Sequence, residues 1–332
     1  MRVLVTGATG FIGSHLVQAL LDDGYSVRVV VRSQPKRLRT QPWLSNGDVE
    51  VFSGDVTRPA SINDAVRGID VVFHLAALLG NRADTASQLS EVNIFGTKVV
   101  VDASYEANVR QIVYLSTTGV MGRLKTLPGT LNHPYNPGNE YERSKSEAER
   151  YVLKSVEEGR VSATIVRPSH VYGPGEFNTL PIYRLMKRLG ILALPNGGNS
   201  CFQPLYVTDL ARALVLCADK EDKSRNRIYI AAGGEVVTFK EFLKLSAKIM
   251  KTDVKILGIP EKLLRCIGVA NKKISDATKL PEIVTQSRIE FFHRNHVYDT
   301  KPISSDLGWS PKVCLADGLN ETIGWYVLNG LL

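Results

Sequence analysis

Tyr141 and Lys145 stand four positions apart in the run Tyr141-Glu142-Arg143-Ser144-Lys145. Residues at this spacing share one face of a helix, so the ammonium of Lys145 would lie near the phenol of Tyr141. A nearby positive charge favours the ionised form of a phenol and lowers its pKa. The pair is therefore a candidate for proton transfer, in which Tyr141 gives or takes the proton and Lys145 tunes it.

A glycine-patterned segment at the amino terminus, Thr6-Gly7-Ala8-Thr9-Gly10-Phe11-Ile12-Gly13, lies between an apolar run and a helical pattern. Glycines at such a turn allow a tight bend, let backbone N–H groups approach a pyrophosphate and permit close packing of helix on strand. The spacing is Gly-x-x-Gly-x-x-Gly rather than the more familiar Gly-x-Gly-x-x-Gly. We expect a dinucleotide to contact Gly7, Thr9, Gly10, Phe11, Ile12 and Gly13.

Arg32 follows the apolar run at residues 27–31. A dehydrogenase that prefers NAD usually presents an acidic residue to the ribose 2′-hydroxyl at this place. Guanidinium and ammonium groups there could instead bind a 2′-phosphate. A solvated basic loop is the alternative, because charge runs usually face water. We expect NADP as the cofactor, with NAD as the alternative, on the basis of Arg32 and the cations after it, Lys36, Arg37 and Arg39.

The elements that would position these residues alternate regularly over the first half of the chain. Apolar, β-branched runs occur at residues 3–6, 27–31, 49–52, 71–75, 112–116 and 163–166. Continuous apolar strands separated by helices are typical of a parallel sheet that is covered on both faces. The pattern predicts an α/β, doubly wound parallel sheet. Its longer helices are expected at residues 13–23, 88–108 and 141–157, with glycine stops at Gly24 and Gly159.

The regular alternation ends after Gly173-Pro174-Gly175. We expect residues 1–172 to form the dinucleotide-binding domain and residues 173–332 to form a smaller, mostly helical C-terminal substrate lobe. This lobe could return strands to the main sheet. Its helices are expected at residues 179–189, 208–217, 239–251, 260–267 and 315–328.

Composition narrows the classes of protein. The 332 residues are 44% hydrophobic, which is enough for a sizeable core. A signal-peptide pattern and a membrane-length apolar run are both missing, so we expect a cytoplasmic protein without a membrane span. The four cysteines form no Cys-x-x-Cys pair, which argues against a metal site. The net charge of +8 suits anionic ligands, but the cations are spread along the chain, so nucleic acid is not expected.

Eight short segments, taken in order, resemble the extended short-chain dehydrogenase/reductase family, and this resemblance implies a Rossmann fold. The segments are residues 6–13, 54–56, 74–77, 93 with 96–97, 115–117, 141–145, 167–168 with 171–175, and 306–309. The resemblance also implies a small-molecule substrate. A homodimer would form through the helices near residues 88–108 and 141–157.

The same resemblance implies roles for single residues. Tyr141 would be the acid/base, Lys145 would lower its pKa and hold the nicotinamide ribose, and Thr117 would bind the reacting oxygen. Hydride transfer to a carbonyl develops negative charge on that oxygen, which a phenol and a hydroxyl can stabilise. Ser116 competes with Thr117, because adjacent strand residues point opposite ways. Further cofactor contacts implied are Asp55, Val56, Leu75, Ala76, Ala77, Pro168, Ser169 and His170, with Asn93 in support.

Within this family the residues favour a reductase or dehydrogenase that moves a hydride between nicotinamide and a secondary alcohol or ketone. Dehydratases carry an Asp-Glu pair after the active-site Thr, where this chain has Thr118-Gly119. Nucleotide-sugar enzymes carry an Arg for the diphosphate shortly before the Tyr-Val that matches residues 206–207, where this chain has Phe202-Gln203-Pro204-Leu205. Residues 287–309 are more similar to the ketone-reductase and 3β-hydroxysteroid-dehydrogenase branch.

Two other functions stay open. One is a nucleotide-sugar or phosphosugar epimerase that retains tightly bound NAD. The other is a non-catalytic dinucleotide-binding protein that serves as an assembly subunit or sensor, although such proteins usually lose the Tyr or the Lys, and this chain keeps both.

Overall fold

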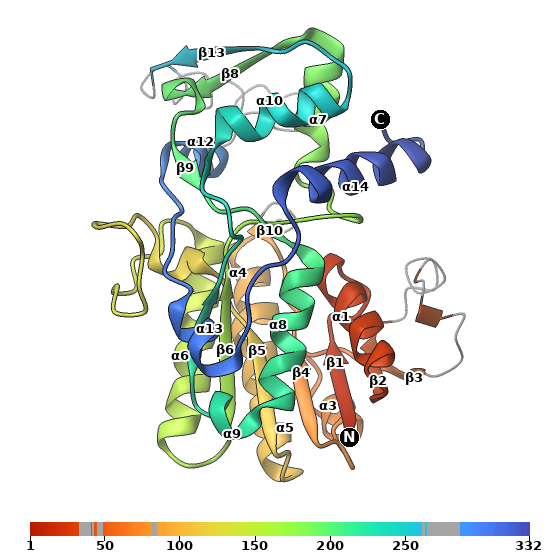
Figure 1. Ribbon diagram of the computed structural model, residues 1–332. Coiled ribbons are helices and arrows are strands. Elements are labelled where there is room, and N and C mark those ends of the chain that lie inside the picture. The colour runs from red at the N-terminus through yellow and green to blue at the C-terminus, as the bar shows by residue number, and fades with distance from the viewer. Residues whose placement is uncertain (33–40, 42, 45–48, 81–84, 261–262, 264–285) are drawn as a thin grey trace.

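A seven-stranded parallel sheet forms the centre of the computed structural model, which describes residues 1–32, 41, 43–44, 49–80, 85–260, 263 and 286–332. Helices cover both faces of this sheet (Figure 1), which confirms the predicted doubly wound fold. The strand order is β11-β6-β5-β4-β1-β2-β3. The strands are β1 Arg2–Thr6, β2 Ser26–Val31, β3 Val49–Ser53, β4 Val71–His74, β5 Gln111–Leu115, β6 Ala163–Pro168 and β11 Ile228–Ala231.

The central strands are apolar along their length because both of their faces are covered. Every residue of β4, β5 and β6 is buried, whereas no residue of the edge strand β3 is buried. Val5 of β1 pairs with Phe73 of β4, and both are fully buried in one core cluster. Such burial stabilises the sheet by about 1.5–3 kcal/mol for each large apolar side chain.

Before β5, the described part of the chain forms α-helices and one π-helical turn between the strands. These are α1 Phe11–Asp22, α3 Pro59–Ala65, α4 Ala86–Leu89, η3 Ser90–Phe95 and α5 Gly96–Glu106. The continuous helix expected at residues 88–108 is therefore interrupted by the π-helical segment η3. The side chain of Asn93 within η3 is buried and bonds the backbone of Leu78, a contact that apolar periodicity does not reveal.

After β5, a 3-10 turn η4 (Thr118–Met121) leads towards α6 (Glu140–Glu157), and β6 follows. The chain then alternates between the lobe and the main sheet. Helix α8 (Val207–Asp219) packs on α1 in the sheet core, and β11 pairs with β6. Residues beyond 173 thus complete one edge of the sheet, as the sequence allowed. Within the described ranges, none of the helices has the length and apolarity needed to cross a membrane.

The lobe lies at the carboxyl end of the sheet strands, in the upper part of Figure 1. A cluster of buried aromatic and aliphatic side chains holds it together. The helix expected at residues 260–267 falls almost wholly outside the described residues. The remaining elements are β7 Val171–Tyr172, α7 Leu180–Leu189, β8 Ile191–Pro195, η5 Asn196–Gly198, β9 Cys201–Phe202, β10 Leu205–Tyr206, α9 Glu221–Ser224, β12 Val237–Thr238, α10 Phe239–Ile249, β13 Lys255–Ile259, α12 Gln286–His293, α13 Lys301–Leu307 and α14 Leu315–Leu328.

Candidate active site

The glycine segment lies where the strand order reverses, at the carboxyl end of β1. Strand β1 pairs with β2 on one side and with β4 on the other, and such a reversal opens a crevice in doubly wound sheets. Gly7 has a φ of +77°, and a Cβ on this residue would lie 2.7 Å from the backbone N of Ala76. A Cβ on Gly13 would lie 2.1 Å from the carbonyl O of Gly7. Only glycine allows these backbone segments to approach so closely.

The first turn of α1 offers backbone donors at this crevice. Gly10 is the N-cap of α1, and no side chain caps the helix there. Thr9, Phe11 and Ile12 are partly exposed and Gly10 is exposed. The first N–H groups of a helix need outside acceptors, and the helix dipole favours an anion. The residues present therefore fit the pyrophosphate of a dinucleotide.

Arg32 is exposed directly after β2. The last residues of β2 and β3, Val31 and Ser53, are paired, and the N–H of Gly54 donates to the carbonyl of Val31 at 3.1 Å. Arg32 therefore lies at the same sheet edge as Asp55. The other cations of the expected 2′-phosphate site lie outside the described residues: Lys36, Arg37 and Arg39.

The carboxylate of Asp55 holds its own turn, because its Oδ1 accepts from the N–H and the hydroxyl of Thr57, both at 2.9 Å. Val56 is buried in the core cluster beside α5. A Cβ on Gly96 of α5 would lie 2.9 Å from the Cγ2 of Val56. The side chain of Val56 thus packs inward on α5.

The loop after β4 forms the other wall of the crevice. The N–H of Leu75 donates to the carbonyl of Thr6 at 3.2 Å, and the N–H of Ala76 donates to the Thr6 hydroxyl at 3.3 Å. Leu75 and Ala76 are half-buried, and Ala77 is exposed. Leu75 and Ala76 therefore lie beside the glycine segment.

Tyr141 and Lys145 lie in the first turns of α6. Asn139 caps this helix, and its Oδ1 accepts from the N–H of Glu142 at 2.9 Å. Lys145 is buried, its Nζ donates to the carbonyl O of Leu115 at 2.8 Å, and it stands 4.2 Å from the centre of the Tyr114 ring. Helix α6 is thereby joined to the carboxyl end of β5.

Thr117 and Ser116 face different surroundings. The hydroxyl of Ser116 is buried and donates to Glu149, whereas Thr117 is partly exposed and its Oγ1 accepts from the N–H of Gly119 at 3.1 Å. A Cβ on Gly119 would lie 3.3 Å from the Thr117 Oγ1 and 3.0 Å from the Cγ of Glu142. Thr117 therefore lies close to the start of α6, and Ser116 turns into the protein.

Tyr141 also approaches the β4 loop, because a Cβ on Gly80 would lie 3.3 Å from the Cβ of Tyr141. Burial raises the pKa of Tyr141 to about 12, and the charge of Glu142 adds to this shift. Burial lowers the pKa of Lys145 to about 7, against the opposing charge of Glu149. Desolvation is therefore the largest effect on the pKa of both groups.

A buried network under the site was not expected from the sequence. Glu149 accepts from Ser116, from the Tyr135 hydroxyl at 2.7 Å and from the Arg167 Nε at 3.0 Å. The side chains of Glu149 and Arg167 are 0% and 4% exposed. The spacing of Glu149, four residues after Lys145, was the available signal, because it places both on one face of α6.

Asn93 and His74 have supporting contacts. The Nδ2 of Asn93 donates to the carbonyl of Leu78 at 3.0 Å and to the Ser144 hydroxyl at 2.8 Å, which ties η3 to α6. The ring of His74 is bonded to the hydroxyls of Thr6 and Thr97, and burial lowers its pKa to about 3. Asn93 thus positions the helix that carries Tyr141 and Lys145.

The segment after β6 is held by its neighbours. The carbonyl O of Pro168 accepts from the Thr118 hydroxyl at 3.1 Å, and the hydroxyl of Ser169 donates to the carbonyl O of Gln203 at 2.6 Å. The His170 ring packs on the rings of Phe202 and Phe291. Pro168 and Ser169 are buried, and His170 is partly buried.

The segment at which nucleotide-sugar enzymes carry an Arg for the diphosphate is uncharged in this chain, and its side chains make internal contacts. Phe202 is buried and stacks on Phe239 at 4.2 Å between ring centroids. The side chain of Gln203 donates to the carbonyl of Gly233 at 3.2 Å and accepts from the N–H of Tyr298 at 2.6 Å. Neither side chain is available to bind an anionic substrate.

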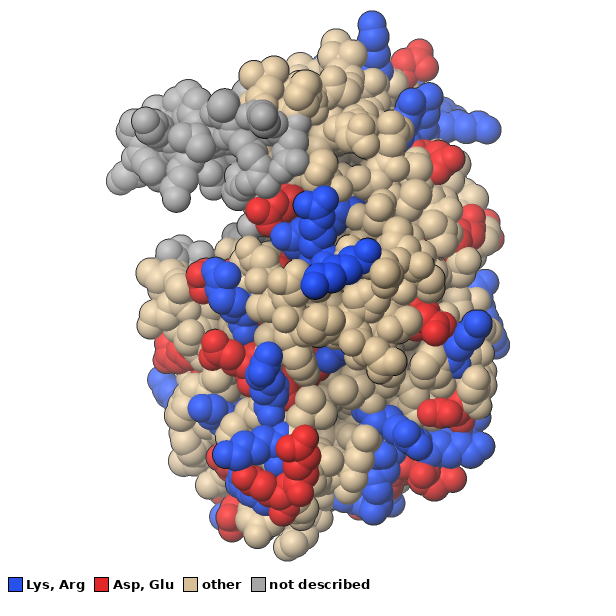
Figure 2. Space-filling view, turned by 90° about the vertical axis from the view of Figure 1, so that its left-hand side faces the viewer, with Lys and Arg blue, Asp and Glu red and all other residues tan. Residues whose placement is uncertain are grey.

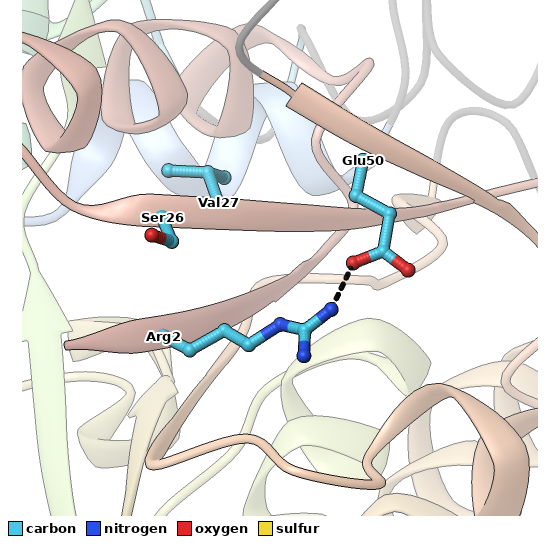
Figure 3. A pocket seen from close by; sticks show the side chains of 4 residues that line it. All are labelled: Arg2, Ser26, Val27 and Glu50. Carbon is cyan, nitrogen blue, oxygen red and sulfur yellow. Dashed lines mark hydrogen bonds and ion pairs between the residues drawn. The ribbon is translucent and has the colours of Figure 1, made fainter.

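A surface hollow of about 340 Å³ at the amino ends of the strands is lined by Arg2, Ser26, Val27 and Glu50 (Figure 3). Arg2 and Glu50 form an ion pair there at 2.6 Å, and both are about half exposed. This hollow lies at the end of the sheet opposite to Tyr141. The described residues contain no group of His, Cys, Asp and Glu arranged to hold a metal ion.

Comparison with known proteins agrees with this geometry. Residues 3–232 match the model of the NAD dependent epimerase/dehydratase family. Ceramide reductase of Caulobacter vibrioides is 28% identical over 332 residues, covering 99% of this chain and 96% of that protein. Sterol demethylase protein B of Methylococcus capsulatus is 30% identical over 278 residues, covering 81% of this chain and 80% of that protein.

Solved structures also superpose over the whole chain. The UDP-glucose 4-epimerase of Thermotoga maritima has a TM-score of 0.80 at 24% identity, covering 99% of both chains. MoeE5 in complex with UDP-glucuronic acid and NAD has a TM-score of 0.78 at 26% identity, covering 99% of this chain and 100% of the other. The chain therefore belongs to the NAD dependent epimerase/dehydratase family, whose enzymes are extended short-chain dehydrogenases/reductases.

Proposed function

We propose that the protein transfers a hydride between a nicotinamide dinucleotide and a secondary alcohol or ketone on a large apolar substrate. The convergence of Tyr141 and Thr117 beside the glycine crevice carries this proposal. Gly119 lies between Thr117 and the start of α6, and Gly80 brings the crevice wall against Tyr141. A proton donor and a hydroxyl would thus lie near a nicotinamide bound in this crevice, which would supply or accept the hydride.

The protonation of these groups suits ketone reduction. With a pKa of about 12, the Tyr141 phenol keeps its proton at neutral pH and can donate it to the oxygen as negative charge develops. The Thr117 Oγ1 accepts from the N–H of Gly119, so its own proton is free to point at the same oxygen. Lys145 would hold the ribose hydroxyls. Its hydrogen bond to the carbonyl O of Leu115 fixes the position of its ammonium group at the end of β5.

An apolar substrate is supported by the lobe and by the relatives. Phe202 and Gln203 occupy the expected diphosphate position without a positive charge. The names ceramide reductase, sterol demethylase protein B and sterol-4-alpha-carboxylate 3-dehydrogenase, the last from Saccharomyces cerevisiae at 26% identity, describe relatives that act on lipids. We infer that a lipid ketone or alcohol is the substrate class.

The activity test uses Tyr141→Phe with Tyr151→Phe as the matched control on the same helix. The Tyr151 hydroxyl binds Asp102 at 2.7 Å, away from Thr117. With 3-ketosteroids and long-chain ketones, we expect NADPH oxidation by wild type and by Tyr151→Phe, and a loss of at least about a hundredfold for Tyr141→Phe. Equal activity of the two variants would contradict the assignment of Tyr141.

The proposed preference for NADP depends on Arg32. Fluorescence titration should show tighter binding of NADPH than of NADH. Arg32→Ala should weaken NADPH binding and leave NADH binding unchanged, because only NADPH carries the 2′-phosphate. Tighter binding of NADH by wild type would overturn this preference.

A nucleotide-sugar epimerase is the second candidate, supported by MoeE5, whose structure contains UDP-glucuronic acid and NAD. An epimerase would copurify with NAD and interconvert UDP-sugars without net change in nicotinamide absorbance. Stabilisation by UDP-sugars alone in a thermal-shift panel that also contains sterols and ketones would favour it.

A further inference from the structure

An exposed apolar face occurs at the outer end of the lobe, far along the chain from Tyr141. Leu189 ends α7, Ile191 begins β8 and Leu257 lies on β13, and they are 58%, 47% and 40% exposed. The intervening Leu192 is buried in the lobe core. Because strand side chains alternate, one face of the β8–β13 ribbon packs on the lobe and the other points outward.

The parallel pairing joins this outward face into one surface. Ile191 pairs with Lys255, and Ala193 pairs with Leu257. Gly190 connects Leu189 to Ile191, and its carbonyl accepts from the N–H of Lys255 at 2.8 Å. Three large exposed aliphatic side chains on adjoining segments are more than the scattered single residues found on ordinary surfaces. We call this surface, Leu189, Ile191, Ala193 and Leu257, the apolar tip.

Cations surround the apolar tip. Lys187 and Arg188 lie in the last turn of α7, and Lys251 and Lys255 flank the start of β13; all four are exposed. A hollow of about 430 Å³ between α10 and β13 is lined by Lys240, Lys244, Asp253, Val254, Lys255 and Ile256. Figure 2 shows Lys and Arg side chains projecting at the top of the molecule, where the lobe lies.

Acidic side chains on these elements offset the cations only in part. Asp253 lies in the hollow. Glu241 of α10 is engaged by the capping box of that helix, in which its carboxylate accepts from the N–H and the hydroxyl of Thr238 at 2.7 and 2.8 Å. The surface around the apolar tip is therefore positive.

We propose that the apolar tip and its cations dock the protein on the surface of an anionic lipid bilayer. Aliphatic side chains gain by entering the boundary between head groups and acyl chains, while lysine and arginine beside them attract anionic head groups. A nucleic acid would use the cations but not the aliphatic side chains. The combination of exposed aliphatic side chains with neighbouring lysines, three of which line the hollow beside β13, favours a bilayer. This proposal is independent of the proposed reaction, although both concern lipids.

The test is vesicle co-sedimentation of the full chain. Vesicles of phosphatidylcholine alone are compared with vesicles that also contain phosphatidylglycerol. We expect binding only to the anionic vesicles, and weaker binding as salt rises. Lys244→Glu with Lys255→Glu should weaken binding at least about thirtyfold, since each lysine near an anionic surface contributes roughly fivefold. Leu189→Ser with Ile191→Ser and Leu257→Ser should also weaken it.

The matched control reverses two exposed cations elsewhere, Arg67→Glu with Lys154→Glu, whose side chains are 77% and 69% exposed. This control changes the net charge equally and should bind anionic vesicles at least about thirtyfold more tightly than Lys244→Glu with Lys255→Glu. Thermal midpoints and NADPH titration check that every variant is folded. These readouts need no turnover, so failure of the proposed reaction would leave them intact.

Three outcomes would overturn the proposal. Equal loss of binding in both charge variants would show that only net charge matters. If soluble glycerol 1-phosphate fully displaced the protein from anionic vesicles, the lysines would form a site for a free anion. A protein that bound duplex DNA but not vesicles would contradict a bilayer. If the lysine variant lost this DNA binding and the serine variant kept it, the surface would be one for nucleic acid. Sedimentation velocity without lipid tests whether the serine variant instead disrupts a contact between copies of the chain.

Discussion

Burial lowers the pKa of Lys145 to about 7 in the folded chain, against an ordinary value of 10.5. Between these values the unfolded chain binds the proton more readily than the folded chain does. The free energy of unfolding contributed by Lys145 therefore rises with pH across this window and is lost as pH falls through the folded pKa. We expect Lys145→Met to remove this rise, as measured by urea unfolding at several pH values.

Lys154→Met is the control for this prediction. Lys154 lies on the same helix, but its side chain is 69% exposed, so its removal should leave the pH dependence of the wild type. The same rise in Lys145→Met as in wild type would show that the lysine is solvated in the folded chain. Loss of turnover in Lys145→Met does not enter this comparison, because unfolding is measured without substrate.

Glycines in this chain fall into two physical classes, and alanine should separate them. A Cβ on Gly13 would meet the Gly7 carbonyl at 2.1 Å, whereas a Cβ on Gly324 in α14 would meet nothing within 4 Å. We expect Gly13→Ala to destabilise by about 1–3 kcal/mol through overpacking and to weaken dinucleotide binding. Gly324→Ala should stabilise by about 0.5–1 kcal/mol, because alanine loses less entropy in a helix. Urea unfolding and NADPH titration measure both effects.

The site could be read from the sequence wherever a residue's role depends on its immediate neighbours in the chain. Gly7 to Gly13 and the Tyr141–Lys145 spacing are such local patterns. The Glu149–Arg167 ion pair could be predicted only in part. The spacing of Glu149 from Lys145 is visible in the sequence, but the contact of Glu149 with Arg167 of β6 depends on the fold. Burial by distant segments raises the pKa of Tyr141, and this cause cannot be inferred from the spacing of Tyr141 and Lys145.

At the scale of elements, the cap of α6 places the catalytic candidates. Asn139 accepts from the N–H of Glu142, one residue after Tyr141. Replacing a cap by alanine costs about 1 kcal/mol and lets the first turn fray. We expect Asn139→Ala to lower both stability and kcat, because fraying moves Tyr141 relative to Thr117. Urea unfolding and steady-state kinetics on the same samples measure the two effects.

Thr238→Ala provides a control of the same kind. Thr238 caps α10 in the lobe by accepting from the N–H of Glu241 at 3.1 Å. This variant should lose a similar free energy of unfolding and keep the wild-type kcat. If both variants lost activity in proportion to stability, the cap of α6 would have no special role in placing Tyr141.

The elements themselves were predictable to different degrees. Strands β1, β2, β4 and β5 agree with the expected runs within one residue at each end, because β-branched residues buried on both faces give a continuous apolar signal. The π-helical segment η3 escaped prediction, and apolar periodicity does not reveal the bond between Asn93 of this segment and Leu78. Helix α3 was also missed, although Pro59 stands in its first turn and is a known start signal.

For the whole molecule, the sequence allowed strands of the second half to rejoin the main sheet but could not say which. The pairing of β11 with β6 is a contact between segments about 60 residues apart. Its recognition needs the edge of the sheet, which only the assembled fold presents. The lobe was harder still, because its short strands pair with each other across long connections, as β8 does with β13.

The expected homodimer makes a prediction at this scale. Phe95 and Tyr105 are 46% and 43% exposed, and with Lys98 and Asp102 they follow one stripe along η3 and α5. Asp102 accepts from the hydroxyl of Tyr151 on α6 at 2.7 Å, so the two helices present a joined surface. Burying such aromatic side chains against a second copy would contribute most of the dimer contact.

We expect Phe95→Glu with Tyr105→Glu to convert a dimer to a monomer in sedimentation velocity, because two carboxylates per copy would be brought face to face across a two-fold axis. Val327→Glu with Leu328→Glu is the control; these residues of α14 are 55% and 88% exposed. The control should stay dimeric. Dissociation by the α14 variant alone would place the contact between copies on the lobe and contradict the assignment to α5 and α6.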